Sequence, residues 1–221
     1  NYGTPYINND FFNRKSNMDY FFIRSREAYL LTPATIEYYN TRTPYTRLDY
    51  SQSENKNKKS ETRFNVLHSQ NVNPYWNFTF RYDQAKSLGQ YKKQESKNNF
   101  IALYSSYSNN NLNIHSGFIG NSIKNGENGG LENDDDLLIQ SETDFILNPR
   151  LSESQSLFSS NYFFTNGEYR FGKLIKTDTD SGKFKPFLGI LYSFEYQRHK
   201  QEFIDEELVD NTFFPNTYKS L

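Results

Sequence analysis

The chain has 221 residues and a formal net charge of −1, from 25 basic and 26 acidic side chains. Charges this evenly balanced argue against a nucleic-acid-binding protein, which needs a basic surface. Cysteine is absent, which excludes disulfide bonds and thiolate metal sites but assigns no cellular compartment.

The composition combines low hydrophobicity with many aromatic rings. Hydrophobic residues make up 35% of the chain and the mean hydropathy is −0.89, yet there are 18 Tyr and 20 Phe. Disordered chains contain few aromatic residues, so we expect a folded protein. No run approaches the ~20 consecutive apolar residues of a membrane helix. Apolar residues at alternate positions are typical of a transmembrane β-barrel, whose strands have only one apolar face.

The chain divides into an irregular beginning and a regular remainder. Residues 1–43 are rich in Asn and Tyr, with short apolar groups interrupted by charges, and we expect an irregular N-terminal lead-in there. Residues 44–221 are expected to form the first strands of an outer-membrane β-barrel. The alternation of apolar and polar residues predicts strands near 44–53, 61–70, 75–83, 99–107, 112–120, 157–172 and 184–197.

The strand near 75–83 has the clearest pattern. One parity is wholly aromatic and the other holds Asn77, Thr79, Arg81 and Asp83, so the strand has one aromatic and one polar face. An arginine is therefore expected to be tolerated at Thr79 but not at its neighbour Phe78. The strand near 99–107 begins with apolar residues on both parities, and alternation assigns no lipid side to it.

The connections alternate between short and long. Short turns near 71–74 and 108–111 are followed by polar segments at 84–98 and 121–155, which is typical of outer-membrane barrels with long loops on the outer face. A Greek-key sandwich lacks this alternation. The sequence thus favours an all-β, antiparallel, up-and-down transmembrane barrel. Such bacterial barrels have an even number of strands, ~8 or more, so we interpret the chain as an incomplete N-terminal part whose edges pair with strands beyond Leu221 or in another chain.

Alternation also assigns candidate residues to the two faces of this wall. The candidates to face a wet lumen are Arg47, Asp49, Arg63, Asn65, Asn77, Arg81, Asp83, Asn113, His115, Glu168, Arg170 and Glu195. The candidates to face lipid are Trp76, Phe78, Phe80, Tyr82, Leu188, Ile190, Tyr192 and Phe194. Cations and anions alternate in the first group, which predicts no strong ion selectivity.

One segment has a specific family resemblance. Residues 37–50, EYYNTRTPYTRLDY, resemble the YYNTxTPYTxLxY motif of the putative porins of Bacteroidota outer membranes. Shorter, less specific similarities follow in the same order to about residue 217, including the stretches 69–72, 115–119 and 169–172. The resemblance implies a porin-like barrel of the bacterial cell outer membrane, with its closing strands missing here. It supplies no catalytic residues.

The remaining candidates for chemistry are weak. Glu132 and the Asp134–Asp136 run could bind Ca²⁺ but lack the spacing of a calcium loop, as does Asp178-x-Asp180-x-Gly182. The histidines His68, His115 and His199 lie on separate segments, and a shared metal site is not expected. The sequence has no Gly-x-Ser-x-Gly motif of a serine hydrolase. We expect no enzyme activity, no cofactor and no metal.

Two functions remain open. The first is a membrane barrel that passes small polar solutes, contacts outer-membrane lipid, and could assemble with other outer-membrane proteins or lipoproteins. The alternative is a secreted, soluble β-sandwich that binds glycans or a protein partner through exposed aromatic residues. Nucleic acid is not expected as a partner of either.

Overall fold

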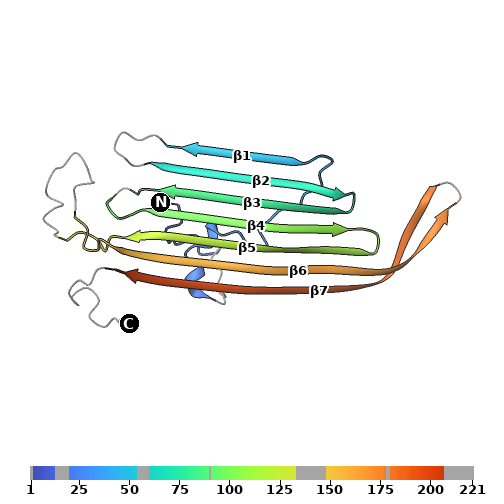
Figure 1. Ribbon diagram of the computed structural model, residues 1–221. Coiled ribbons are helices and arrows are strands. Elements are labelled where there is room, and N and C mark those ends of the chain that lie inside the picture. Colours follow the sequence, from blue (N-terminus) through green and yellow to red (C-terminus); the bar gives the residue numbers. More distant parts are fainter. Residues whose placement is uncertain are drawn as a thin grey trace.

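The computed structural model describes residues 2–12, 20–53, 60–89, 91–132, 148–177 and 180–206. Within these residues, seven antiparallel strands form one sheet in chain order (Figure 1). They are β1 (Tyr45–Gln52), β2 (Glu61–Asn73), β3 (Trp76–Ser87), β4 (Ser96–Ser108), β5 (Leu112–Glu127), β6 (Ser154–Thr177) and β7 (Asp180–Asp205). The prediction of an all-β, up-and-down, antiparallel architecture is confirmed.

The described strands are mostly longer than the predicted ranges. β4 begins at Ser96 and β7 extends from Asp180 to Asp205, where the sequence predicted 99–107 and 184–197. Alternation detects a strand only where apolar and polar residues alternate, whereas pairing depends on backbone hydrogen bonds that polar residues make equally well. The polar strand ends were therefore missed.

The sheet is open. β1 pairs with β2 alone and β7 with β6 alone among the described residues, so the two outer strands do not meet. This agrees with the prediction that these strands by themselves form an incomplete barrel. β6 and β7 also continue past Tyr169, the last β6 residue that pairs with β5, as a two-stranded ribbon (Figure 1).

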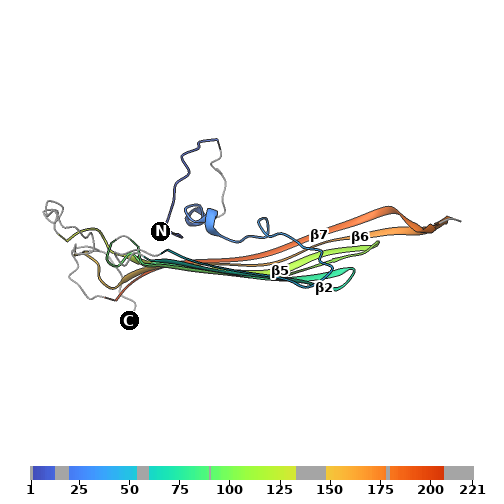
Figure 2. The same cartoon turned by 90° about the horizontal axis from the view of Figure 1, so that it is seen from above.

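The beginning of the chain lies against this sheet. Residues 2–12 and 20–43, here named the N-terminal segment, contain two single-turn 3₁₀ helices, η1 (Phe21–Ile23) and η2 (Glu27–Tyr29). Figure 2 shows that the segment stands on one side of the sheet only. In the described residues, no helix has the length and apolar character to cross a membrane.

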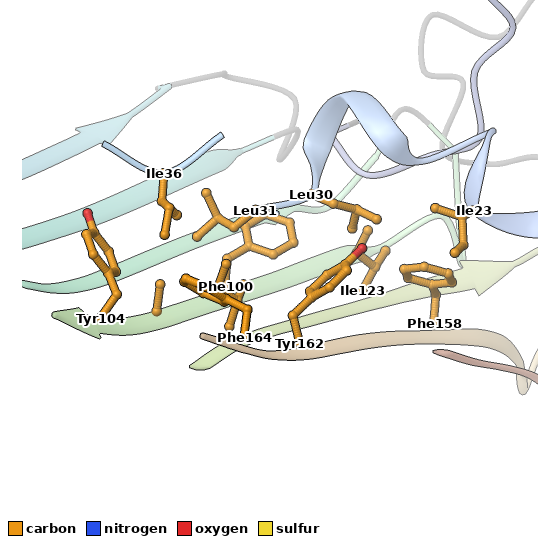
Figure 3. Close-up of a cluster of buried hydrophobic side chains, with 12 residues drawn as sticks. Ile23, Leu30, Leu31, Ile36, Phe100, Tyr104, Ile123, Phe158, Tyr162 and Phe164 are labelled. Atoms are coloured by element: carbon orange, nitrogen blue, oxygen red, sulfur yellow. The ribbon is translucent and has the colours of Figure 1, made fainter. Parts of the chain in front are cut away.

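A buried apolar cluster joins the segment to the sheet (Figure 3). The segment contributes Ile23, Leu30, Leu31 and Ile36, and the sheet contributes Phe100, Ala102, Tyr104, Ile119, Ile123, Phe158, Tyr162 and Phe164. This cluster explains the apolar residues on both parities at the start of β4. One set, including Phe100 and Ala102, is buried under the segment, while Ile101 and Leu103 on the opposite face are exposed.

The cluster predicts where the fold is most sensitive to truncation. Phe158 is 2% exposed, so Phe158→Ala should lower the free energy of unfolding by about 3–5 kcal/mol, because it leaves a cavity under the segment. Phe21→Ala, at a side chain 86% exposed, should cost less than about 0.5 kcal/mol. Urea titrations in detergent micelles would measure both. Equal effects would contradict the packing described here.

Candidate lumen face and its N-terminal cover

The strand register defines two faces. Directly paired residues in antiparallel strands point to the same side, and one continuous row across the sheet is Arg47, Leu67, Arg81, Ala102, Ile119, Tyr162 and Gln197. We name the face of this row the inner face, because the N-terminal segment covers it. The opposite side is the outer face.

The structure separates the two groups of candidate residues. By strand register, Arg47, Asp49, Arg63, Asn65, Asn77, Arg81, Asp83, Asn113, His115, Glu168, Arg170 and Glu195 all lie on the inner face. Trp76, Phe78, Phe80, Tyr82, Leu188, Ile190, Tyr192 and Phe194 all lie on the outer face. Their contact with water or lipid stays a prediction.

The outer face is apolar and exposed. Its exposed large side chains include Leu48, Leu103, Phe118, Phe163, Ile190 and Tyr196. They extend over strands from β1 to β7, because each strand presents alternate residues on this side. Apolar surface of this extent marks a site that contacts lipid or another protein.

Three arginines of the inner face are each paired with a carboxylate of the same strand. Arg47 Nε lies 3.0 Å from Asp49 Oδ2, and Arg81 Nη2 lies 2.8 Å from Asp83 Oδ2. In β6, Arg170 Nε lies 3.3 Å from Glu168 Oε2. Residues i and i+2 share a face of a strand, so this spacing brings each cation to its own anion. The result is a charged but locally neutral surface.

Neutral polar side chains form a second network on this face. Thr79 is fully buried, and its hydroxyl lies within hydrogen-bonding distance of Ser69 Oγ, at 3.0 Å, and of Asn77 Oδ1, at 3.1 Å. An arginine at Thr79 would lose these bonds and lack room. The expectation that this position tolerates arginine is therefore wrong, because alternation reports the face of a residue but not its burial.

Asparagine side chains of the wall hold the backbone of the N-terminal segment. Asn121 is 2% exposed; its Oδ1 accepts from Leu31 N and its Nδ2 donates to Leu31 O, both at 2.9 Å. Asn98 Nδ2 donates to Tyr2 O at 2.6 Å. Gly3 follows with φ +90, and a Cβ there would collide with the Asn98 side chain. Sequence reasoning missed these anchors, because asparagine on a polar strand face gives no distinguishing signal.

Aromatic contacts add to this attachment. The Tyr38 ring lies 4.3 Å from the His115 ring and 5.5 Å from the Tyr104 ring, centroid to centroid. Burial raises the pKa of Tyr38 to about 12, so its phenol is neutral at physiological pH. The guanidinium of Arg26 lies 5.3 Å above the Phe158 ring, and burial lowers the pKa of Arg26.

A shallow cavity of about 440 Å³ lies near the β4–β5 turn end of the inner face. Its polar lining includes Asn113, His115, Asn166, Glu168 and Ser193. Asn113 Oδ1 and His115 Nδ1 are buried without a hydrogen-bond partner. Asn113 Oδ1 can accept a hydrogen bond from a small polar molecule, and His115 Nδ1 can donate or accept one according to its tautomer.

The histidines and acidic residues are not gathered into a metal centre in the part of the chain described. His115 and His199 lie on the inner face beside Tyr38 and Tyr20, whereas His68 lies on the outer face beside Phe78. No group of three or more potential ligands occurs among the described residues. Asp134–Asp136 and Asp178, named as weak calcium candidates, lie outside them.

The chain matches the sequence pattern of a known protein family. No curated protein and no solved structure matches the chain. The sequence pattern of a family described as "putative porin" matches residues 1–221, the whole of the sequence. A family with this description accords with one antiparallel sheet that has an apolar exposed face and a charged, polar opposite face. The chain belongs to the putative porin family.

Proposed function

We propose that this chain forms part of the wall of a bacterial outer-membrane β-barrel, through which small polar solutes diffuse passively. The observation that carries the proposal is the segregation of the sheet into an exposed apolar face and a charged face. Membership of the porin family supports the same function. In this proposal the outer face contacts lipid and the inner face lines a water-filled lumen.

The strand geometry is compatible with this location. A tilted membrane strand needs ~9–11 residues, and β2 to β7 each contain 12 or more. The free edges of β1 and β7 must be paired in a bilayer, because each unsatisfied backbone group in hydrocarbon costs several kcal/mol. We therefore propose that further strands, outside the described sheet, complete the barrel. Assembly with other outer-membrane proteins would serve the same purpose.

The alternative, a soluble β-sandwich, receives less support. A sandwich buries one face of each sheet against the other sheet. In the described residues, the face that is covered is the inner one, and an irregular segment covers it. The apolar face, which a sandwich would have to bury, is the exposed one.

Reconstitution of the complete barrel, together with the strands or partner proteins that close it, into planar lipid bilayers and liposomes tests the proposal. We expect stable single-channel conductance, and faster swelling of liposomes in small neutral sugars than in large oligosaccharides. Solubility of the folded protein without detergent, together with an absence of conductance, would overturn the proposal in favour of the soluble alternative.

The paired charges predict weak ion selectivity. The inner-face candidates comprise four arginines and four carboxylates, so these residues give their part of the wall no excess of either sign. Replacing Arg47, Arg81 and Arg170 with Gln leaves Asp49, Asp83 and Glu168 unpaired, and the lumen should become cation-selective. The reversal potential in a KCl gradient measures this. A reversal potential unchanged by the triple substitution would show that these residues do not line the passage.

The assignment of the faces predicts that arginine destabilises the protein at one position of β7 and not at the next. Tyr196 is exposed on the outer face and Gln197 on the inner face, at the same height as Ala102 and Ile119. Tyr196→Arg should destabilise the protein in lipid by about 2–4 kcal/mol if this height is the bilayer midplane. Gln197→Arg should be close to neutral. Folding titrations in lipid vesicles compare the two substitutions. The reverse ranking would show that the inner face, and not the outer face, contacts lipid.

A further inference from the structure

We propose that the N-terminal segment is a fixed constriction inside the barrel, lying along the inner wall and narrowing the passage for solutes. This inference rests on the proposed function, because it takes the inner face as the lumen wall. It assigns the lead-in of the chain a role in setting how large a solute can pass.

The first argument is the apolar patch on the inner face. The inner side of a water-filled barrel is polar, yet Phe158, Phe164 and Ile119 point to this side and are at most 2% exposed. Such residues would be unfavourable in contact with lumen water. Figure 3 shows Phe158 and Phe164 beneath Ile23, Leu30, Leu31 and Ile36 of the segment, and Ile119 belongs to the same cluster. The patch is therefore the part of the wall against which the segment packs.

The second argument is that the segment is attached at three heights. At one end, Ser96 Oγ and Asn98 Nδ2 donate to Tyr2 O, and Asn125 Nδ2 donates to Gly3 O. In the middle, the Asn121 amide makes its two bonds with the Leu31 backbone.

The third attachment lies at the other end of the wall. Asn71 Nδ2 donates to Asn40 Oδ1 at 2.7 Å, and Asn71 Oδ1 accepts from Thr41 N at 3.2 Å. By register, Asn71 lies in the same row as His115. From Asn125 to His115 along β5 the distance is roughly 33 Å, at ~3.3 Å per residue.

This span has a direct consequence for the passage. His115 and Asn125 lie ten residues apart in β5, which matches the ~9–11 residues that a tilted strand needs to cross the membrane, so the segment lies along the wall over the depth of the membrane. Figure 2 shows that parts of it also stand well away from the sheet. Solutes therefore pass between the segment and the remaining wall, in a lumen narrower than the strands alone would enclose.

The position of the segment is tested by crosslinking in the intact outer membrane. The chain contains no cysteine, so Tyr38→Cys with His115→Cys places the only two thiols of this sequence where two rings are in contact. A short thiol-specific crosslinker should join them. In the matched control, Tyr38→Cys with Phe118→Cys, the second thiol lies on the outer face and should not react. Absence of the first crosslink would overturn the inference.

The effect on the passage is tested by releasing the segment. Leu31 is 7% exposed in the cluster, and Leu31→Asp should free the segment and raise single-channel conductance at least twofold. Ala34→Asp adds the same charge at an exposed position of the segment and should leave conductance unchanged. Deletion of residues 2–39 provides a second form if Leu31→Asp fails to fold. Unchanged conductance in a folded released form would overturn the constriction.

The two experiments also separate this inference from the proposed function. If the Tyr38–His115 crosslink forms but no variant conducts, the proposed passage of solutes is wrong, and the constriction with it. If the protein conducts but the crosslink does not form, the proposed diffusion of solutes stands, and the placement of the segment inside the barrel is wrong.

Discussion

The backbone pairing of the antiparallel strands is the constraint on which the rest of the structure depends. Because side chains alternate across each strand, the register carries the two faces from β1 to β7 over the seven-stranded part of the sheet. It shifts only near strand ends, at Asn71/Asn73 and in the β6–β7 ribbon beyond Phe171. A slip of one residue between any two strands would move aromatic residues onto the charged side. The separation of an apolar outer face from a polar inner face is thus a property of the whole sheet.

The inner face serves two purposes at once. Part of it consists of arginine–carboxylate pairs and hydrogen-bonded asparagine, serine and threonine. Another part is the apolar patch against which the N-terminal segment packs. Buried polar groups must be hydrogen-bonded to be stable. Asn121 meets this need by binding the backbone of Leu31, an irregular stretch that has no strand partner. The wall therefore supplies hydrogen bonds to the backbone of the segment, and the segment shields the apolar part of the wall from water.

This mutual dependence connects the fold with the proposed function. A barrel wall alone defines the diameter of a lumen, whereas a segment attached to the wall at several heights reduces it without additional strands. The polar cavity beside Tyr38, with the unpaired atoms of Asn113 and His115, lies where the segment approaches the end of the wall. The local neutrality of the charges accords with a passage that distinguishes solutes by size more than by sign.

The sequence by itself determined the fold class and the face of each candidate residue. Alternation at Trp76–Tyr82 or Leu188–Phe194 is local, and a period of two converts directly into two sides of a sheet. It could not determine burial, and Thr79 shows why: this residue is fully buried and bonded to Ser69 of the neighbouring strand, a contact that local alternation does not reveal. The sequence also did not predict the apolar patch under the N-terminal segment. Phe100 and Phe158 have the pattern of ordinary strand residues, and their burial comes from a cluster with Leu31, which is distant in sequence. Contacts between an irregular segment and a sheet have no periodicity, so only the tertiary structure decided them.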